Sequence, residues 1–115
     1  MTLSLDLNAM EPGLRYKLLT AVVIPRPIAW VTTVGIDGTV NAAPYSFFNI
    51  FGQDPALVIL GLEHHADGTA KDTTENIRRT GEFVINMFTP DLTDAMINTA
   101  ATYASDVFEP EAFGV

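Results

Sequence analysis

The sequence predicts a mainly β fold with short helices, an α+β protein in which hairpin-linked strands form an antiparallel barrel or sandwich. Segments rich in β-branched and aromatic residues recur between glycine and proline turns, which is typical of short strands. We find roughly four or five such strands and two short helices in the second half of the chain, besides the short helix that Leu14–Thr20 could form. The length of 115 residues corresponds to one domain, so we expect a single domain over 1–115.

The net charge of −8 and the lack of cysteine exclude several classes of function. Six Lys and Arg residues cannot form a broad basic surface, so we expect neither nucleic acid nor an anionic membrane as the main partner. Without cysteine there is no disulfide, thiolate metal site or cysteine nucleophile. Residues 1–10 lack the features of a signal peptide, and no apolar stretch approaches the roughly 18 residues of a membrane helix. The expected location is the cytoplasm.

The first half of the chain is expected to build one hairpin. Pro25 and Pro27 require extended backbone before the first strand. Within that strand we expect Trp30 to lie in the core. Asp37 suits the turn that follows. The expected elements are a surface segment at Met1–Gly13, a short helix at Leu14–Thr20, a strand at Ile28–Val34, a turn at Gly35–Gly38 and a strand at Thr39–Ala43.

The second half alternates strands with helices. The almost wholly apolar run at Ala56–Leu62 predicts a strand buried on both faces. Residues 89–115 contain several carboxylates, and no Lys or Arg follows Thr89. This composition predicts an acidic helical or loop tail. The other expected elements are a turn at Asp54–Pro55, a loop at Glu63–Ala70, a helix at Thr73–Arg79 ended by Gly81, a strand at Glu82–Phe88 and a helix at Pro90–Thr102.

The stretch Asn41–Asn49 is a candidate ligand site. It places Tyr45, Ser46, Phe47 and Phe48 beside small residues and asparagines, with no charge. Apolar rings can cover the faces of a flat ligand while hydroxyl and amide groups bind its edges. The alternative is an aromatic strand end packed in the core.

The stretch Lys71–Asn76 is a second candidate. Asp72 can cap the following helix, with Glu75 completing a capping box, and Thr73 with Asn76 is another possible cap. The free amides of a helix N-terminus and the Lys71 ammonium also suit a phosphate. The sequence leaves open whether this is a phosphate site or only a capped surface helix.

Other candidates have ordinary structural roles as alternatives. Thr32 and Thr33 point to opposite sides of their strand, so one can face a ligand. Arg26 can reach an anion or pair with a carboxylate. His64 and His65 are adjacent, cannot converge on one metal and suit a solvated loop, with a substrate contact as the alternative.

The sequence gives no basis for naming a catalytic residue or a metal ligand. No nucleophile–base pair stands out, because Ser46 has no histidine nearby in the sequence. No GxGxxG follows a strand and no GxxxxGK[ST] is present, so any nucleotide must bind without a Rossmann or P-loop device.

Several motifs, taken in order, resemble the flavin reductase-like family, whose fold is the FMN-binding split β-barrel. They are Pro25–Thr33 (PRPIAWVTT), Asn41–Asn49 (NAAPYSFFN), Asp54–Pro55, Lys71–Thr73 with Asn76–Ile77, and Gly81–Asn86 (GEFVIN). The resemblance implies a homodimer with FMN near the subunit interface. The residues that it assigns to FMN are Thr32 and Thr33 beside the flavin, Ser46, Phe47 and Asn49 along the isoalloxazine and ribityl chain, and Lys71, Asp72 and Thr73 near the phosphate.

The resemblance implies an oxidoreductase that passes a hydride from NADH or NADPH to flavin, and electrons then to free flavin, a partner oxygenase or another acceptor. An FMN-binding electron carrier that does not use NAD(P)H is the alternative. Family members usually continue past a segment such as Tyr103–Val115 with strands that complete the barrel. A third hypothesis is therefore a shortened domain that binds no flavin.

Overall fold

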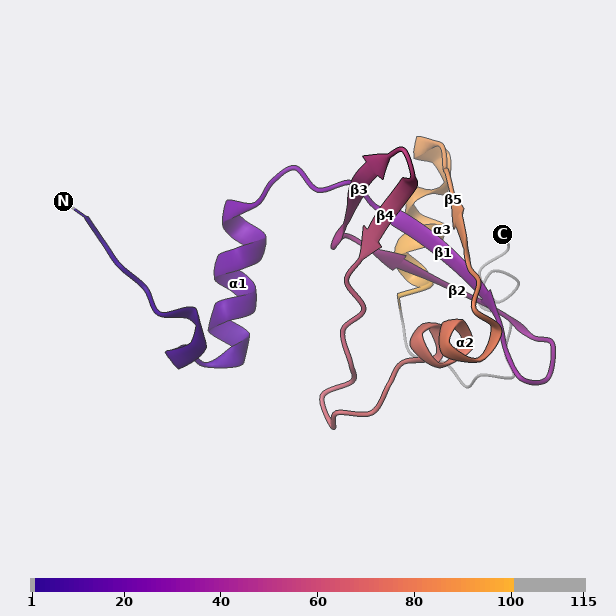
Figure 1. The fold of residues 1–115 in the computed structure, drawn as a ribbon, viewed down its shortest axis with the longest axis horizontal. Helices are drawn as coiled ribbons and strands as arrows, with labels where there is room; N and C mark the ends of the chain where they lie inside the picture. Colours follow the sequence, from indigo (N-terminus) through magenta and orange to yellow (C-terminus); the bar gives the residue numbers. More distant parts are fainter. Residues whose placement is uncertain (1, 101–115) are drawn as a thin grey trace.

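The computed structural model describes residues 2–100 and contains two antiparallel sheets (Figure 1). Three strands pair in the order β2-β1-β5, and the other two form a separate hairpin, β3-β4. Their bounds are Ala29–Val34 (β1), Val40–Tyr45 (β2), Phe48–Gln53 (β3), Ala56–Leu60 (β4) and Val84–Asn86 (β5).

The predicted first hairpin is confirmed. β1 and β2 pair from Ala29 opposite Tyr45 to Val34 opposite Val40. The Gly38 backbone has φ of +85°, in the left-handed region that glycine adopts without a steric cost. Two-residue periodicity places alternate side chains of β1 on opposite faces of the sheet.

The second hairpin differs from the prediction in two ways. Residues 48–53 form a strand of their own, β3, which the sequence did not predict, and the expected turn at Asp54–Pro55 joins it to β4. The prediction that 56–62 is buried on both faces is wrong: β4 ends at Leu60, and its side chains from Ala56 to Ile59 are exposed. In the described residues β4 pairs with β3 alone, so no neighbouring strand shields it.

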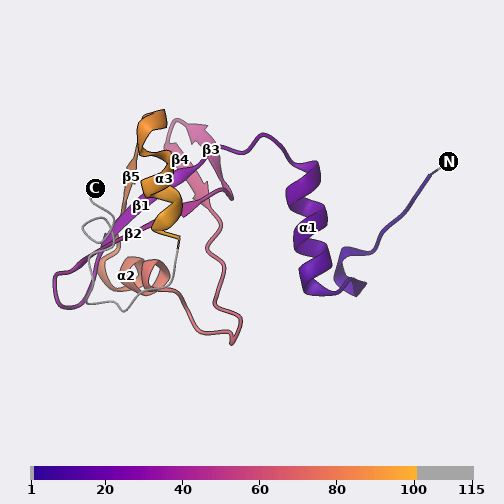
Figure 2. The ribbon, with the colours of Figure 1, turned by 180° about the vertical axis from the view of Figure 1, so that it is seen from behind.

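Helix α1 (Pro12–Val22) lies to one side of both sheets, and the N-terminal segment extends beyond it (Figures 1 and 2). It is longer than predicted because Glu11 caps it, accepting hydrogen bonds from the Gly13 and Leu14 amides at 2.9 and 3.0 Å. The N-terminal segment, which includes a 3-10 turn (Leu7–Ala9), is almost wholly exposed, as expected of a surface segment, but it extends away from the sheets.

Helices α2 and α3 are near their predicted places. α2 (Asp72–Thr80) ends at Gly81, whose φ is +74°. The predicted helix at 90–102 is a 3-10 turn (Pro90–Leu92) followed by α3 (Thr93–Asn98), and residues from 101 onward lie outside the described part. Within residues 2–100, no helix has both the length and the apolar character needed to cross a membrane.

The core lies around β1. On one face the Asn76 amide of α2 donates to Thr33 Oγ1 at 3.0 Å. On the other, the Trp30 indole donates to Thr99 Oγ1 at 3.2 Å, which holds the end of α3. The Phe88 ring meets the Trp30 ring edge-on at 6.0 Å. Trp30 is therefore a core residue, as predicted.

Candidate functional site

Two adjoining hollows meet where β2 ends and β3 begins. The larger has a volume of about 360 Å³ and the smaller about 160 Å³. Ser46 and Phe47 line both, so the two residues between β2 and β3 are common to the pair. We call these two hollows together the corner site.

The larger hollow is mainly apolar. Its walls include Leu19 of α1, Val23 directly after that helix, and Ile59 of β4. Asn49 adds a polar group from β3. A volume of this size with apolar walls and a few polar groups is typical of small-molecule sites.

The smaller hollow is more polar. Tyr16, Glu63 and Lys71 line it beside Ser46 and Phe47. The Tyr16 ring of α1 lies 6.0 Å from the Phe47 ring, inclined by 45°. Lys71 brings a cation to the start of α2, and Glu63 brings an opposing carboxylate.

Arg26 joins α1 to the corner site. Its Nε donates to Ser46 Oγ at 3.3 Å, and its guanidinium lies 5.9 Å from the centre of the Phe47 ring. Its Nη1 donates to the Thr20 and Val23 carbonyl oxygens, each at 2.8 Å. The side chain thus contacts both residues that the hollows share.

The start of α2 differs from the predicted capping box. Lys71 is the N-cap residue and its side chain makes no capping hydrogen bond, whereas Asp72 is the first helical residue. Asp72 and Glu75 line a separate hollow of about 190 Å³, together with Arg79. Thr73 does not cap with Asn76 either, because it is buried and accepts a hydrogen bond from the Asn41 amide at 3.0 Å.

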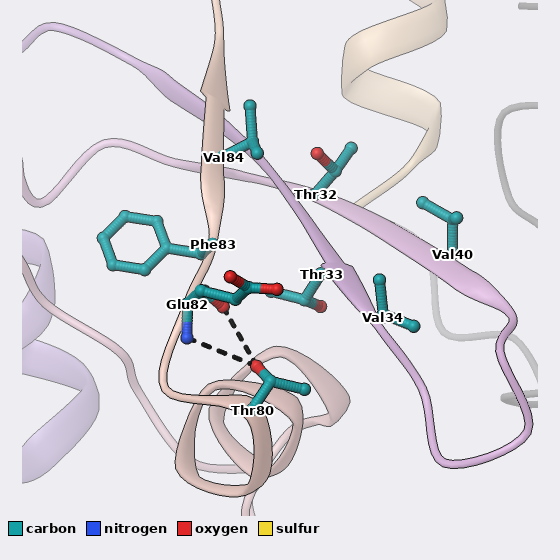
Figure 3. A pocket seen from close by; sticks show the side chains of 8 residues that line it. All are labelled: Thr32, Thr33, Val34, Val40, Thr80, Glu82, Phe83 and Val84. Carbon is teal, nitrogen blue, oxygen red and sulfur yellow. Dashed lines mark hydrogen bonds between the residues drawn. The ribbon is translucent and has the colours of Figure 1, made fainter.

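Thr32 and Thr33 lie on opposite sides of β1, as predicted, and line another hollow of about 290 Å³ (Figure 3). Its remaining walls are largely apolar and include Phe83 and Val84. Both hydroxyls have partners within the protein. Thr33 Oγ1 accepts from Asn76, and Thr32 Oγ1 accepts from the Asn86 amide at 3.1 Å.

Comparison with known proteins identifies the family. A family model for the flavin reductase like domain matches residues 21–115. The chain belongs to the flavin reductase-like family. The predicted resemblance is therefore confirmed. This flavin reductase-like chain is 42% identical over 114 residues to an uncharacterised protein of Deinococcus radiodurans, and 39% identical over 100 residues to one of Aquifex aeolicus.

Those alignments cover 96% and 87% of this flavin reductase-like chain, but 50% and 51% of the two relatives. The chain thus spans about half the length of the curated relatives it matches.

Solved structures show the same fold. Nitrilotriacetate monooxygenase component B from Bacillus cereus superposes with a TM-score of 0.89 at 38% identity, covering 99% of this chain and 56% of that one. The 2-nitrobenzoate 2-nitroreductase NbaA of Pseudomonas fluorescens gives 0.82 at 35%, covering 97% and 52%. A split barrel domain protein of Shewanella frigidimarina gives 0.75 at 25%, covering 94% and 52%. The predicted split-barrel fold class with short helices is confirmed.

The flavin reductase-like fold brings only part of the predicted site together. Ser46, Phe47 and Asn49 line the larger hollow, and Lys71 lines the smaller one beside the first two. The other predicted cofactor residues lie in other hollows or in the packing of α2 against the sheet: Thr32, Thr33, Asp72 and Thr73. The assignment of all eight to FMN remains a prediction.

The loop between β4 and α2 holds the two histidines. His64 is exposed and His65 half-buried, and the His65 amide donates to the Thr69 carbonyl oxygen at 2.9 Å. The Asp67 carboxylate accepts from the Thr69 hydroxyl at 2.6 Å and amide at 2.9 Å, which lowers the pKa of Asp67. Short-range hydrogen bonds of this kind hold the loop as a turn.

Sequence reasoning missed the contribution of α1 to the corner site. Tyr16, Leu19 and Val23 carry no motif, and their contact with residues 46–47 is non-local. One signal was present: the helix is rich in apolar residues without a clear polar face, and such a helix needs cover on several sides.

Proposed function

We propose that this chain binds FMN at the corner site and acts as an oxidoreductase of the flavin reductase type, with NADH or NADPH as electron donor. The observation that carries the proposal is the pairing of an apolar hollow beside Arg26 with a polar hollow beside Lys71. Both open on Ser46 and Phe47, two of the residues that the family resemblance assigns to FMN.

The residues present fit the parts of FMN. The flat ring system fits the larger hollow, where Leu19 and Ile59 supply apolar cover and Asn49 a polar group. The phosphate fits the smaller hollow, where Lys71 supplies a cation next to the amides that begin α2. Glu63 opposes a phosphate there, so its removal is an informative test.

Bound FMN would supply the electron-transfer chemistry. The residues of this chain bind the flavin, orient it and exclude water. Phe47 and the apolar walls shield the ring, and Arg26 holds the Ser46 hydroxyl and the Phe47 ring in place. No side chain is assigned as an acid or base.

A partner oxygenase is the electron acceptor that we propose beside free flavin. Its support is the likeness to nitrilotriacetate monooxygenase component B, at 38% identity. We also propose a cytoplasmic location, which agrees with a composition free of cysteine.

We further propose that the chain works as a homodimer of single domains. The β3–β4 hairpin exposes apolar side chains on both of its faces, to 46–74% of their area: Ile50, Phe51, Leu57, Val58 and Ile59. Ile59 also lines the larger hollow, so a second copy that covers the face with Ile59 would help to close the corner site. Light scattering of the flavin-loaded chain at several concentrations tests the dimer, and a strictly monomeric, flavin-loaded species would contradict it.

The test of the function has two stages. The purified chain is loaded with FMN and desalted, and the flavin retained per chain is read from visible absorbance. It is then mixed anaerobically with NADH or NADPH. We expect about one flavin per chain, for a single site, and bleaching of the bound flavin. Retained flavin that stays oxidised would identify an electron carrier, and absence of flavin would refute the FMN site.

A further inference from the structure

Arg26 lies where three parts of the molecule meet: the end of α1, the residues between β2 and β3, and the larger hollow. It precedes β1 in the sequence, so it belongs to neither of the elements that it joins. Its hydrogen bonds reach the Thr20 and Val23 carbonyls on one side and Ser46 on the other. The Arg26 side chain therefore links these two parts by direct hydrogen bonds.

Helix α1 depends on such a contact. None of its residues is buried, and a free helix of 11 residues is marginal in water. Its last turn contains no basic residue, so Arg26 supplies from outside the cation that complements the C-terminal carbonyls. The ring contact between Tyr16 and Phe47 ties the same helix to the same place.

The hydrogen bonds of Arg26 to Thr20, Val23 and Ser46 leave part of the guanidinium available. Arginine has five N–H donors, and the hydrogen bonds of the described residues use Nε once and Nη1 twice. They provide no acceptor for the two N–H groups of Nη2. Because Arg26 also lines the larger hollow, Nη2 would be the nitrogen left to donate to a flavin bound there, while Nη1 keeps its hydrogen bonds to Thr20 and Val23.

We propose that Arg26 is a positioning residue that couples the docking of α1 to flavin binding at the corner site. The inference rests on the proposed FMN function of that site. A bound flavin fixes the guanidinium, and the guanidinium fixes α1 beside Ser46 and Phe47. Because coupling between two equilibria is reciprocal, FMN lowers the equilibrium constant for opening of α1 by the same factor by which docked α1 raises FMN affinity.

Hydrogen exchange of the α1 amides in the 115-residue chain, with and without saturating FMN, measures this coupling. FMN affinity is measured separately by fluorescence titration. In the unmodified chain we expect FMN to slow exchange at α1 by about five-fold or more, the lower end of typical coupling factors. In Arg26→Lys the charge remains but the planar fork is lost. That variant is expected to bind FMN with an α1 exchange ratio close to one.

Two further variants separate coupling from general damage. Arg15→Lys is the matched control, because Arg15 also donates to a backbone carbonyl, that of Leu7 at 3.2 Å, and is expected to keep the full effect. Lys17→Pro breaks α1 at an exposed position that lines neither hollow. By reciprocity it is expected to weaken FMN binding by the factor measured in the exchange experiment.

The outcomes are distinct. If the unmodified chain binds FMN and α1 exchange does not change, the coupling is wrong while the FMN site stands. If Arg26→Lys retains the full effect of FMN, Arg26 is not the coupling residue. If the titration shows no FMN binding by the unmodified chain, the proposed function fails and this inference fails with it.

Discussion

The hydrogen bond between Asn76 and Thr33 makes a quantitative prediction about one of the expected flavin residues. Both side chains are nearly inaccessible, at 6% and 3%, and the donor–acceptor distance is 3.0 Å. Asn76→Ala leaves the Thr33 hydroxyl buried without that partner, which is expected to cost about 1–3 kcal/mol of unfolding free energy. Thr33→Val leaves the Asn76 amide buried without its acceptor, at a similar cost in unfolding free energy.

The double variant removes both partners of this bond. Arg79 Nη1, which donates to Asn76 Oδ1 at 3.2 Å, loses that acceptor in both variants that lack Asn76, so this loss cancels in the comparison of the four proteins. We expect the loss in the double variant to be smaller than the sum of the two single losses by about 1–3 kcal/mol. Urea unfolding of the four proteins gives this coupling energy. The control is Asn98→Ala, an exposed asparagine in α3 that is expected to change stability by less than about 0.5 kcal/mol. If the two single losses of unfolding free energy simply add up in the double variant, the coupling energy between Asn76 and Thr33 is zero and the prediction is wrong.

The same variants decide between two roles for Thr33. If its hydroxyl serves only the packing of α2 on β1, Thr33→Val lowers stability and leaves FMN affinity unchanged. We expect this result, because the hydroxyl is buried and already accepts from Asn76. Weaker FMN binding by the folded Thr33→Val variant would refute the reasoning and place Thr33 beside the flavin, as the family resemblance implies.

Four further outcomes are expected. Lys71→Ala lowers FMN affinity by about 1–3 kcal/mol in a titration, whereas Lys17→Ala, on the exposed side of α1, leaves it unchanged; equal affinities would remove Lys71 from the site. Glu63→Gln raises FMN affinity in the same assay, because it removes the carboxylate of the smaller hollow; no gain would move the phosphate elsewhere. The pKa of Glu11 is lowered by the hydrogen bonds from Gly13 and Leu14, so its carboxylate stabilises α1 above its ordinary pKa of 4.5, and that contribution is lost as pH falls through the lowered value. The protection of the α1 amides, measured relative to their intrinsic exchange rates at each pH, should then fall in acid, and less so in Glu11→Gln. Gly81→Ala costs about 1 kcal/mol in urea unfolding, from its positive φ alone, since a Cβ there meets no atom within 4 Å; an unchanged midpoint would contradict this.

Local signals predicted the elements that depend on neighbouring residues. The glycine turn between β1 and β2, the turn at Asp54–Pro55 and the end of α2 at Gly81 are set within a few residues by backbone conformation. The start of α2 was displaced by one residue, because Asp72 and Lys71 can each precede a helix and the sequence does not choose between them.

Non-local contacts account for what the sequence did not reveal. The apolar run at 56–60 reads the same whether or not other strands cover it, so its exposure could not be predicted. The pairing of Asn76 with Thr33 joins residues 43 positions apart, and Tyr16 meets Phe47 only once the chain has folded. Ser46, Phe47 and Asn49 could be recognised because their side-chain types already suit a flat ligand.

The bare β3–β4 hairpin has a consequence for handling the protein. The segment Ala56–Leu60 (ALVIL) combines high β-propensity with no charge, and in the described part β4 pairs only with β3. An uncovered strand of this kind is a template for fibril-like association. The net charge of −8 keeps copies apart in dilute buffer, but salt screens that repulsion. The solubility of the protein should therefore fall as ionic strength rises, as long as the hairpin is not covered by a second copy of the chain.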